Sequence, residues 1–398
     1  MDFNLEPAKQ VVVNRFRQYV DRELIPLEPA FLESGFQAML PQLREKRADV
    51  KKQGLWGPIY PHEHGGLGLD LLTHGLISEA LGRCPFAHYV FGCNAPDAGN
   101  VELLHESGTP AQKKRWLEPL VAGDIRSCFG MTEPDNSGAN PLMLTTRAEP
   151  DGDGWVLNGR KWFTTGADGA SFCIVMAVSD PDAPPHGRAS LFLVPADAPG
   201  YRLVRNTPVM GQAGAGLFSH GEIELKDCRI GTGHLLGARG EGFRLAQARL
   251  GPGRIHHCMR WLGICERALA LMIDRAATRV IAPDGRRLGD SDIVRAWIAE
   301  SAAEIRAARL LVLHGAWRIG QAGVKAARDD ISMIKYHVAG VLQRVVDRAL
   351  QVHGGLGVTD YTLLAWFYRE ERAARIYDGP DEVHKISVAR HLLGNRNG

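Results

Sequence analysis

The stretch ISMIKYHVAGVLQRVVDRALQVHGG, residues 331–355, contains the pattern that decides the fold. Its apolar residues Ile334, Val338, Val341 and Val345 repeat at intervals of four, three and four. This spacing places them on one face of a helix, so the segment predicts a long helix with one buried stripe. Such a stripe is typical of long antiparallel helices that pack in a bundle.

A second segment with the same spacing precedes the first. Its apolar residues are Cys258, Leu262, Cys265, Leu269, Met272 and Ala276. The sequence Ala282-Pro283-Asp284-Gly285 separates the two helical patterns and predicts a loop. We therefore expect residues 241–398 to form a C-terminal four-helix bundle.

The rest of the chain divides into a helical part and a β part. Residues 1–126 read mainly as helix, including Leu71 to Gly82. In residues 127–240 the helical spacing disappears, and short apolar runs such as Phe172 to Val178 lie between turn residues. The predicted fold is α+β and mainly α, with an N-terminal helical domain, a middle antiparallel β domain and the bundle.

Composition excludes several classes of protein. The chain has 398 residues, 45% hydrophobic and 23% charged, with a formal net charge of +2. No basic run alternates with aromatic residues, so we expect no nucleic-acid partner. No stretch reaches about 18 uninterrupted apolar residues, so we expect no membrane span. The seven cysteines show no C-x-x-C pair and the N-terminus is polar, which favours buried, reduced thiols in a cytoplasmic protein.

Neither a Rossmann fingerprint nor a P-loop is present in the sequence. A nucleotide cofactor would therefore be held in another way. Two pairs of histidines, His62 with His64 and His256 with His257, fit no common zinc spacing, so we predict no metal.

Four short motifs follow one another along the chain. They are FGMTEP at 129–134, NGRKWFTTG at 158–166, QVHGG at 351–355 and YDGPDEVH at 377–384. Each alone is explained by a turn, an aromatic strand, a glycine helix cap or a helix start. In this order and spacing they resemble the acyl-CoA dehydrogenase family. The segment LGPGRIHH at 250–257 is similar to sequences of the family branch that is fused in animals to phosphotransferase-like domains.

The resemblance implies a flavoenzyme that binds FAD and oxidises an acyl-CoA thioester between its α and β carbons, as in fatty-acid β-oxidation. It implies Asp378 as the base that removes the α proton, where the family usually carries glutamate. The family's other base position corresponds to Gly253, which cannot act. A helix N-cap is the structural alternative for Asp378.

The resemblance also implies a set of binding residues. Those for FAD are Phe129, Met131, Thr132, Phe163, Thr165, Arg279, Gln351, His353, Gly354, Gly355, Pro380, Asp381 and Glu382. Those for the substrate are Arg254, Tyr377 and Gly379, although Arg254 could instead form a salt bridge within the bundle. Ser137-Gly138-Ala139-Asn140 departs from the family's glycine-serine-aspartate pattern, which bears on how the cofactor phosphate is held.

The implied partners are an electron-transferring flavoprotein as electron acceptor and further copies of the chain in a homodimer or homotetramer. Two alternatives stay open on this evidence. One is an oxygen-using flavin oxidase or monooxygenase on the same scaffold. The other is a relative that binds acyl-CoA without catalysis.

Overall fold

The structure, a computed structural model, describes residues 6–394, with the side chains of residues 250–252 outside that description. The chain forms two compact units. The first contains residues up to 35, then 69–88 and 251 onward, and the second contains residues 36–68 and 89–250. The three-part division at residues 126 and 240 stays a prediction.

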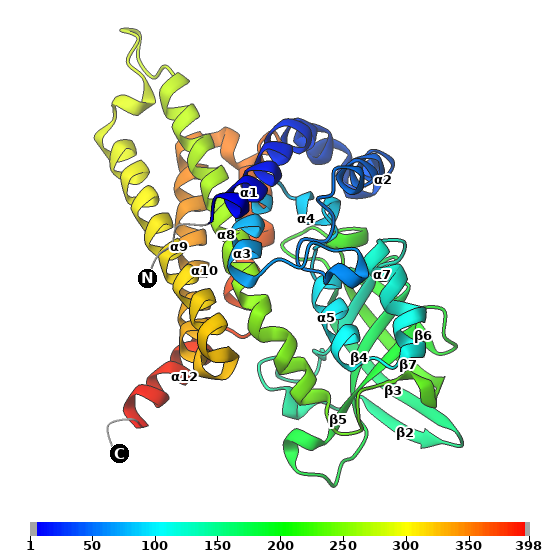
Figure 1. The fold of residues 1–398 in the computed structure, drawn as a ribbon. Coiled ribbons are helices and arrows are strands. Elements are labelled where there is room, and N and C mark those ends of the chain that lie inside the picture. Colours follow the sequence, from blue (N-terminus) through cyan, green and yellow to red (C-terminus); the bar gives the residue numbers. More distant parts are fainter. Residues whose placement is uncertain (1–5, 395–398) are drawn as a thin grey trace. The chain divides into compact units, whose positions relative to one another are not determined.

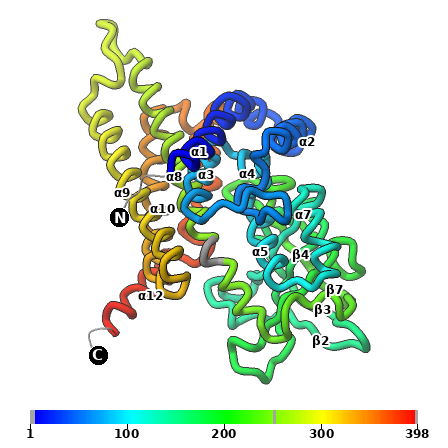
Figure 2. The backbone as a smooth tube through the Cα atoms, viewed as in Figure 1, coloured from blue at the N-terminus to red at the C-terminus, as the bar shows by residue number. Residues whose placement is uncertain are grey.

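The first unit is helical. Its elements are α1 (Pro7–Tyr19), α3 (Leu71–Gly82), most of α8 (Gly242–Thr278), α9 (Asp292–Ala326), α10 (Arg328–His353), α11 (Leu363–Glu371) and α12 (Asp381–Gly394). Helices α9 and α10 run side by side, and α10 also packs on α11 and α12 (Figure 1). The tube in Figure 2 shows the loop between α8 and α9 at the top of the view. The predicted helix from Leu71 to Gly82 is confirmed in full.

The residues that the sequence pattern selected lie in the bundle core. Ile334, Val338, Val341 and Val345 of α10 are fully buried in one hydrophobic cluster. The α8 residues of the second repeat belong to the same cluster or pack against it. Burial of this continuous apolar surface stabilises the helices far more than their intrinsic propensity does. The predicted helical bundle is confirmed.

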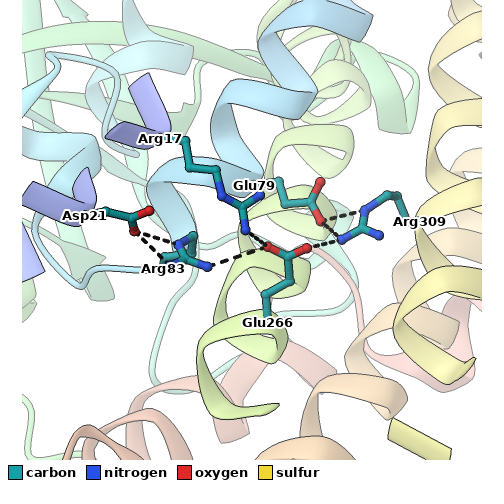
Figure 3. A network of polar contacts seen from close by, with 6 residues as sticks. All are labelled: Arg17, Asp21, Glu79, Arg83, Glu266 and Arg309. Carbon is teal, nitrogen blue, oxygen red and sulfur yellow. Dashed lines mark hydrogen bonds and ion pairs between the residues drawn. The ribbon is translucent and has the colours of Figure 1, made fainter. Parts of the chain in front are cut away.

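A network of charges joins helices of this unit (Figure 3). The Arg309 guanidinium contacts both Glu79 and Glu266, and its Nε lies 2.7 Å from Glu79. Arg17 and Arg83 reach the other oxygen of Glu266, at 3.2 and 3.8 Å. Burial raises the pKa of Glu79, and the Arg309 contact opposes that shift. Arg309 therefore compensates a buried carboxylate.

Substituting Arg17 with alanine is expected to cost less than about 1 kcal/mol of unfolding free energy, because its side chain is half exposed and water screens the ion pair. Urea unfolding followed by circular dichroism measures this. Arg309→Leu is the comparison, since it leaves Glu79 buried without its main partner. A loss in Arg17→Ala as large as that in Arg309→Leu would contradict the prediction.

The second unit is built on an eight-stranded sheet. Its strands are β1 (Ser127–Gly130), β2 (Arg147–Asp151), β3 (Gly154–Thr165), β4 (Phe172–Val178), β5 (Ala189–Pro195), β6 (Tyr201–Asn206), β7 (His220–Gly231) and β8 (Leu235–Leu236). The order is β6-β7-β3-β2-β4-β5-β8, and β1 pairs with β4. Most pairs are antiparallel as predicted, but β1 and β2 both run parallel to β4. Apolar alternation identifies a strand without giving its direction.

Short helices cover one face of this sheet. They are α5 (Asp97–Ser107), α6 (Pro110–Gln112) and α7 (Glu118–Ala122). Val101 and Leu104 of α5 and Val121 of α7 share a buried cluster with Ile174 and Leu193 of the central strands. Two further helices, α2 (Glu28–Lys52) and α4 (Ala87–Val90), contain residues of both units. The backbone of α2 is non-helical at Gly35, so this element consists of two helices joined at a kink.

Two expectations from composition can be compared with the structure. All seven cysteines are free and buried, as predicted. Among the described residues, no helix is both long and apolar enough to span a bilayer.

Candidate active site

The predicted base Asp378 lies in the loop before α12, in an unusual backbone conformation. Its φ is 54°, and the next residue, Gly379, has a φ of 99°. A non-glycine residue at positive φ costs about 1–3 kcal/mol and persists only where its surroundings hold it. Four non-glycine residues within 6–394 have positive φ, and two of them, Phe163 and Asp378, are predicted site residues. Such residues cluster at functional sites.

Hydrogen bonds to the main chain hold this loop in place. The carbonyl oxygen of Asp378 accepts bonds from Arg254, at 3.3 Å from Nε and 3.1 Å from Nη2, and lies 3.1 Å from His384 Nε2. The next carbonyl, that of Gly379, accepts a 2.6 Å bond from Lys335 Nζ. Because these contacts use the backbone, they fix the loop and leave the Asp378 carboxylate available.

The carboxylate of Asp378 faces a histidine of α8. Oδ2 lies 3.3 Å from His257 Nε2, and the two side chains are 22% and 23% exposed. The ring of His257 lies beside those of Tyr377 and Trp261, with centroids 5.5 and 6.1 Å apart. A carboxylate that is largely shielded from solvent and oriented by an imidazole can accept a proton from a substrate that covers it. His257 was not among the predicted site residues.

Tyr377 anchors the start of the loop on α8. Its hydroxyl oxygen accepts bonds from Trp261 Nε1 and Arg260 Nη2, each at 3.0 Å. Arg260 is itself paired with the buried Glu371. Burial raises the pKa of the Tyr377 hydroxyl well above its usual range, so the group stays neutral. The hydroxyl of Tyr377 thus serves the loop, and its role in substrate binding stays a prediction.

Asp381, at the first turn of α12, is buried. Its Oδ2 accepts a 2.7 Å bond from Arg375 Nε, and Lys335 Nζ lies 3.7 Å from Oδ1. Burial lowers the pKa of Lys335, and the charges of Asp381 and Asp378 oppose that effect. The negative charge at a helix N-terminus is also favourable. Lys335 therefore joins the loop, at the Gly379 carbonyl, to the start of α12 at Asp381. The sequence pattern did not predict this role, because a lysine within a helix is normally exposed.

In the second unit, the strands join the first two motifs. Thr132 Oγ1 donates to the Trp162 carbonyl at 2.9 Å, and the Trp162 N–H donates to the Thr132 carbonyl at 3.1 Å. Lys161 Nζ donates to the Met131 carbonyl and to Glu133 Oε1, both at 2.9 Å. The predicted residues Met131 and Thr132 are thereby held on the strand that carries Phe163.

Glu133 and Lys161 form a buried ion pair beneath these motifs. Burial would raise the pKa of Glu133, but the Lys161 charge and the bonds from Thr146 and Thr145 outweigh it and lower that pKa to about 2. Burial lowers the pKa of Lys161 to about 8, with Glu133 opposing. Neither residue was predicted as a site residue. The signal available in the sequence was a lysine at an inward position of an alternating strand.

The remaining predicted residues are not brought into one cluster by the contacts within the first unit. α10 ends at His353, and Gly354 follows with a φ of 61°, which confirms the predicted glycine cap. His353 is buried, and its Nδ1 lies 2.8 Å from the Ala349 carbonyl. Arg279 and Gln351 are exposed. Their roles toward the cofactor stay predictions, as do those of Gly355, Pro380 and Glu382.

Family models match nearly the whole chain. They are the N-terminal domain of acyl-CoA dehydrogenase over residues 6–124, its middle domain over 128–228 and its C-terminal domain over 240–393. The chain therefore belongs to the acyl-CoA dehydrogenase family, and is an oxidoreductase. Proteins of this family are FAD-dependent.

Individual relatives indicate which branch of the family this chain resembles. A probable acyl-CoA dehydrogenase of Mycobacterium tuberculosis, FadE2, is 46% identical over 89% of this chain and 86% of its own length. Acyl-CoA dehydrogenase family member 10 of Mus musculus is 39% identical over 99% of this chain, but the match spans only 38% of the mouse protein. Family member 11 of the same species is matched over 50% of its length. These animal proteins represent the fusion-type branch that the sequence predicted.

Solved structures agree with the fold. A provisionally identified acyl-CoA dehydrogenase from Mycobacterium abscessus has a TM-score of 0.93 at 38% identity, with 99% of this chain and 100% of that chain covered. A chain from a structural study of the electron transferring flavoprotein of Acidaminococcus fermentans has a TM-score of 0.85 at 28% identity, with 99% and 100% covered. The predicted fold class is confirmed.

The second unit exposes groups whose chemistry suits a flat aromatic cofactor. The ring of Phe163 is 46% exposed and lies against that of Trp162, with centroids 4.6 Å apart. Beside this strand is a recess whose lining includes Met131, Thr132 and Gly138. Thr165 Oγ1 lies 3.0 Å from His220 Nδ1, and a hydroxyl can make one such bond and still bind a ligand. An exposed aromatic ring near hydroxyl and main-chain groups suits an isoalloxazine ring.

Proposed function

We propose that this chain oxidises an acyl-CoA thioester between its α and β carbons, with Asp378 as the base that removes the α proton. The observation that carries the proposal is the loop of Asp378. Its backbone is held in a strained conformation by Arg254 and His384, while its carboxylate points to His257 and stays partly exposed. Strain of this kind is retained where a side chain has to be aimed.

Each residue around Asp378 has a distinct part in the proposal. Asp378 accepts the α proton. His257 orients the carboxylate through Nε2. Arg254 positions the loop and lies near the thioester, with Gly379 and Tyr377 on the substrate side. The aspartate side chain is one methylene shorter than that of glutamate. How close the Asp378 carboxylate comes to the substrate therefore depends on how these neighbours position the loop.

FAD, when bound, supplies the acceptor for the hydride from the β carbon, at its N5 atom. We propose that Phe129, Met131, Thr132, Phe163 and Thr165 hold its ring system. Arg279 and the segment 351–355 would hold its phosphates and adenosine, and the segment 380–382 would complete the contact. The chemistry of these groups suits the cofactor, because a guanidinium pairs with phosphate and glycines allow close approach.

We further propose an electron-transferring flavoprotein as the acceptor and a homodimer or homotetramer as the assembly. A chain of similar fold occurs in the structural study of such a flavoprotein, which supports this partner. Because the chain spans half or less of the animal relatives' length, the activity of those whole proteins is not transferred to it.

Anaerobic bleaching of the bound flavin tests the proposed reaction. The purified holoenzyme is mixed with a panel of acyl-CoA thioesters of different chain length, and absorbance of the oxidised flavin is followed. At least one thioester is expected to bleach the flavin at a rate fast enough for catalytic turnover. When air is admitted, little peroxide is expected to form. Rapid peroxide formation would favour the oxidase alternative, and no bleaching by any thioester would favour the non-catalytic one.

A further inference from the structure

Three metal-ligating side chains meet in the second unit, away from the residues discussed above. Glu63 and His64 lie at the short helix His62–His64, and His105 lies in the last turn of α5. The ligand atoms of these three lie within 4.8 Å of one another. Among the described residues, this is the one group of three His, Cys, Asp or Glu side chains that lie close enough together to hold a metal ion. We propose that it binds a divalent cation of the zinc type.

The distances within the cluster suit one cation. His64 Nε2 and His105 Nδ1 are 3.0 Å apart, and Glu63 Oε1 lies 3.7 and 3.6 Å from them. Ligands about 2.0–2.1 Å from a tetrahedral zinc ion are separated from one another by roughly 3.3 Å. The present separations lie on both sides of that value, so a cation can be placed among the three with small side-chain rotations.

The scaffold beneath the cluster is rigid. Tyr60 of the turn and Leu104 of α5 belong to the same buried core, so the two backbone segments are packed together. The turn itself is tight, because the Gly68 N–H donates to the Tyr60 carbonyl at 2.8 Å and a Cβ at Gly66 would overlap that carbonyl. A ligand set on packed elements needs little reorganisation when the ion binds.

Electrostatics also favour a cation at this position. His105 stands at the C-terminal end of an eleven-residue helix, where the partial negative charge of the helix attracts positive charge. Glu63 adds a full negative charge. Both facing imidazole nitrogens need lone pairs to ligate a metal, so the proton that they share in the 3.0 Å contact moves to the other nitrogen of its ring or to solvent.

Imidazole and carboxylate ligands define the kind of ion. Two histidines and one glutamate form a zinc ligand set with an open fourth position for water. Magnesium prefers several oxygen ligands, so it is expected to bind poorly. The spacing of His62, His64, His256 and His257 gave no sign of this site, because His105 lies 41 residues from His64 and approaches it only in the fold.

Zinc titration of the FAD-loaded enzyme tests the proposal. After removal of metals with a chelator, Zn²⁺ is added and binding is measured by calorimetry and by metal analysis. One ion per chain is expected, with no comparable binding of Mg²⁺. His64→Ala and His105→Ala are each expected to weaken Zn²⁺ binding at least about tenfold, because even the loss of a residue that only orients a metal ligand lowers metal affinity by that factor. Glu63→Gln is expected to weaken it less.

His186→Ala is the matched control, because it removes an exposed histidine of the same unit outside the cluster. Its Zn²⁺ affinity is expected to equal that of the unchanged chain. Thermal unfolding gives a second readout, since Zn²⁺ raises the midpoint only where it binds the folded state. The proposal is overturned if the unchanged chain binds no Zn²⁺, or if binding survives in both His64→Ala and His105→Ala. Flavin absorbance shows whether each variant is folded.

Discussion

Asp378→Asn is expected to retain the bound flavin and to lose acyl-CoA-dependent bleaching by a factor of about 10²–10⁴, the usual contribution of a general base. Asparagine has nearly the same shape, and the loop is held through the carbonyls of Asp378 and Gly379, which the substitution leaves in place. The amide, however, cannot accept the α proton. Stopped-flow reduction under anaerobic conditions measures the rate directly.

The matched control is Asp360→Asn, which makes the same change at an exposed residue paired with Arg369 in the same unit. It is expected to bleach at the rate of the unchanged enzyme. A second comparison is Asp378→Glu, which restores a carboxylate and is expected to recover part of the rate. Undiminished bleaching in Asp378→Asn would place the base elsewhere, and loss of flavin from that variant would indicate a structural role for the side chain.

Lys161→Met is expected to destabilise the protein by about 3–5 kcal/mol, because it leaves Glu133 as a buried charge without its partner. The same change removes the donor to the Met131 carbonyl, so FAD retention should also fall. Unfolding in urea, followed by tryptophan fluorescence and by flavin release, measures both effects. Lys226→Met is the control, since Lys226 is exposed on β7.

The pH dependence of this variant follows from Glu133. In the native chain its pKa is lowered to about 2 from the ordinary value of 4.5, so its contribution to stability is present above pH 4.5 and is lost as the pH falls toward 2. Without the Lys161 charge, the native pKa of Glu133 rises and that contribution shrinks. Acid unfolding of Lys161→Met is therefore expected at higher pH. The double variant Lys161→Met, Glu133→Leu should recover much of the stability, and failure to recover it would indicate that lost packing dominates.

Local patterns in the sequence predicted the bundle helices, their buried faces, a central strand and the family of this protein. The repeats in 258–276 and 334–345 predicted the bundle helices and their buried faces, because residues three and four apart share a side of a helix whatever surrounds it. The run from Phe172 to Val178 predicted a strand of the same extent. The four motifs together predicted the family, which the matches over 6–124, 128–228 and 240–393 confirm.

Only the tertiary structure decided which distant residues meet. His257 with Asp378, Lys161 with Glu133, and His64 with His105 are pairs that no local period could reveal, since each depends on how separate elements pack. The same holds for the parallel pairing of β1 with β4 and for the positive φ of Asp378. Local spacing fixes the conformation and the buried face of a segment, whereas the partners of a polar side chain depend on how the whole unit packs.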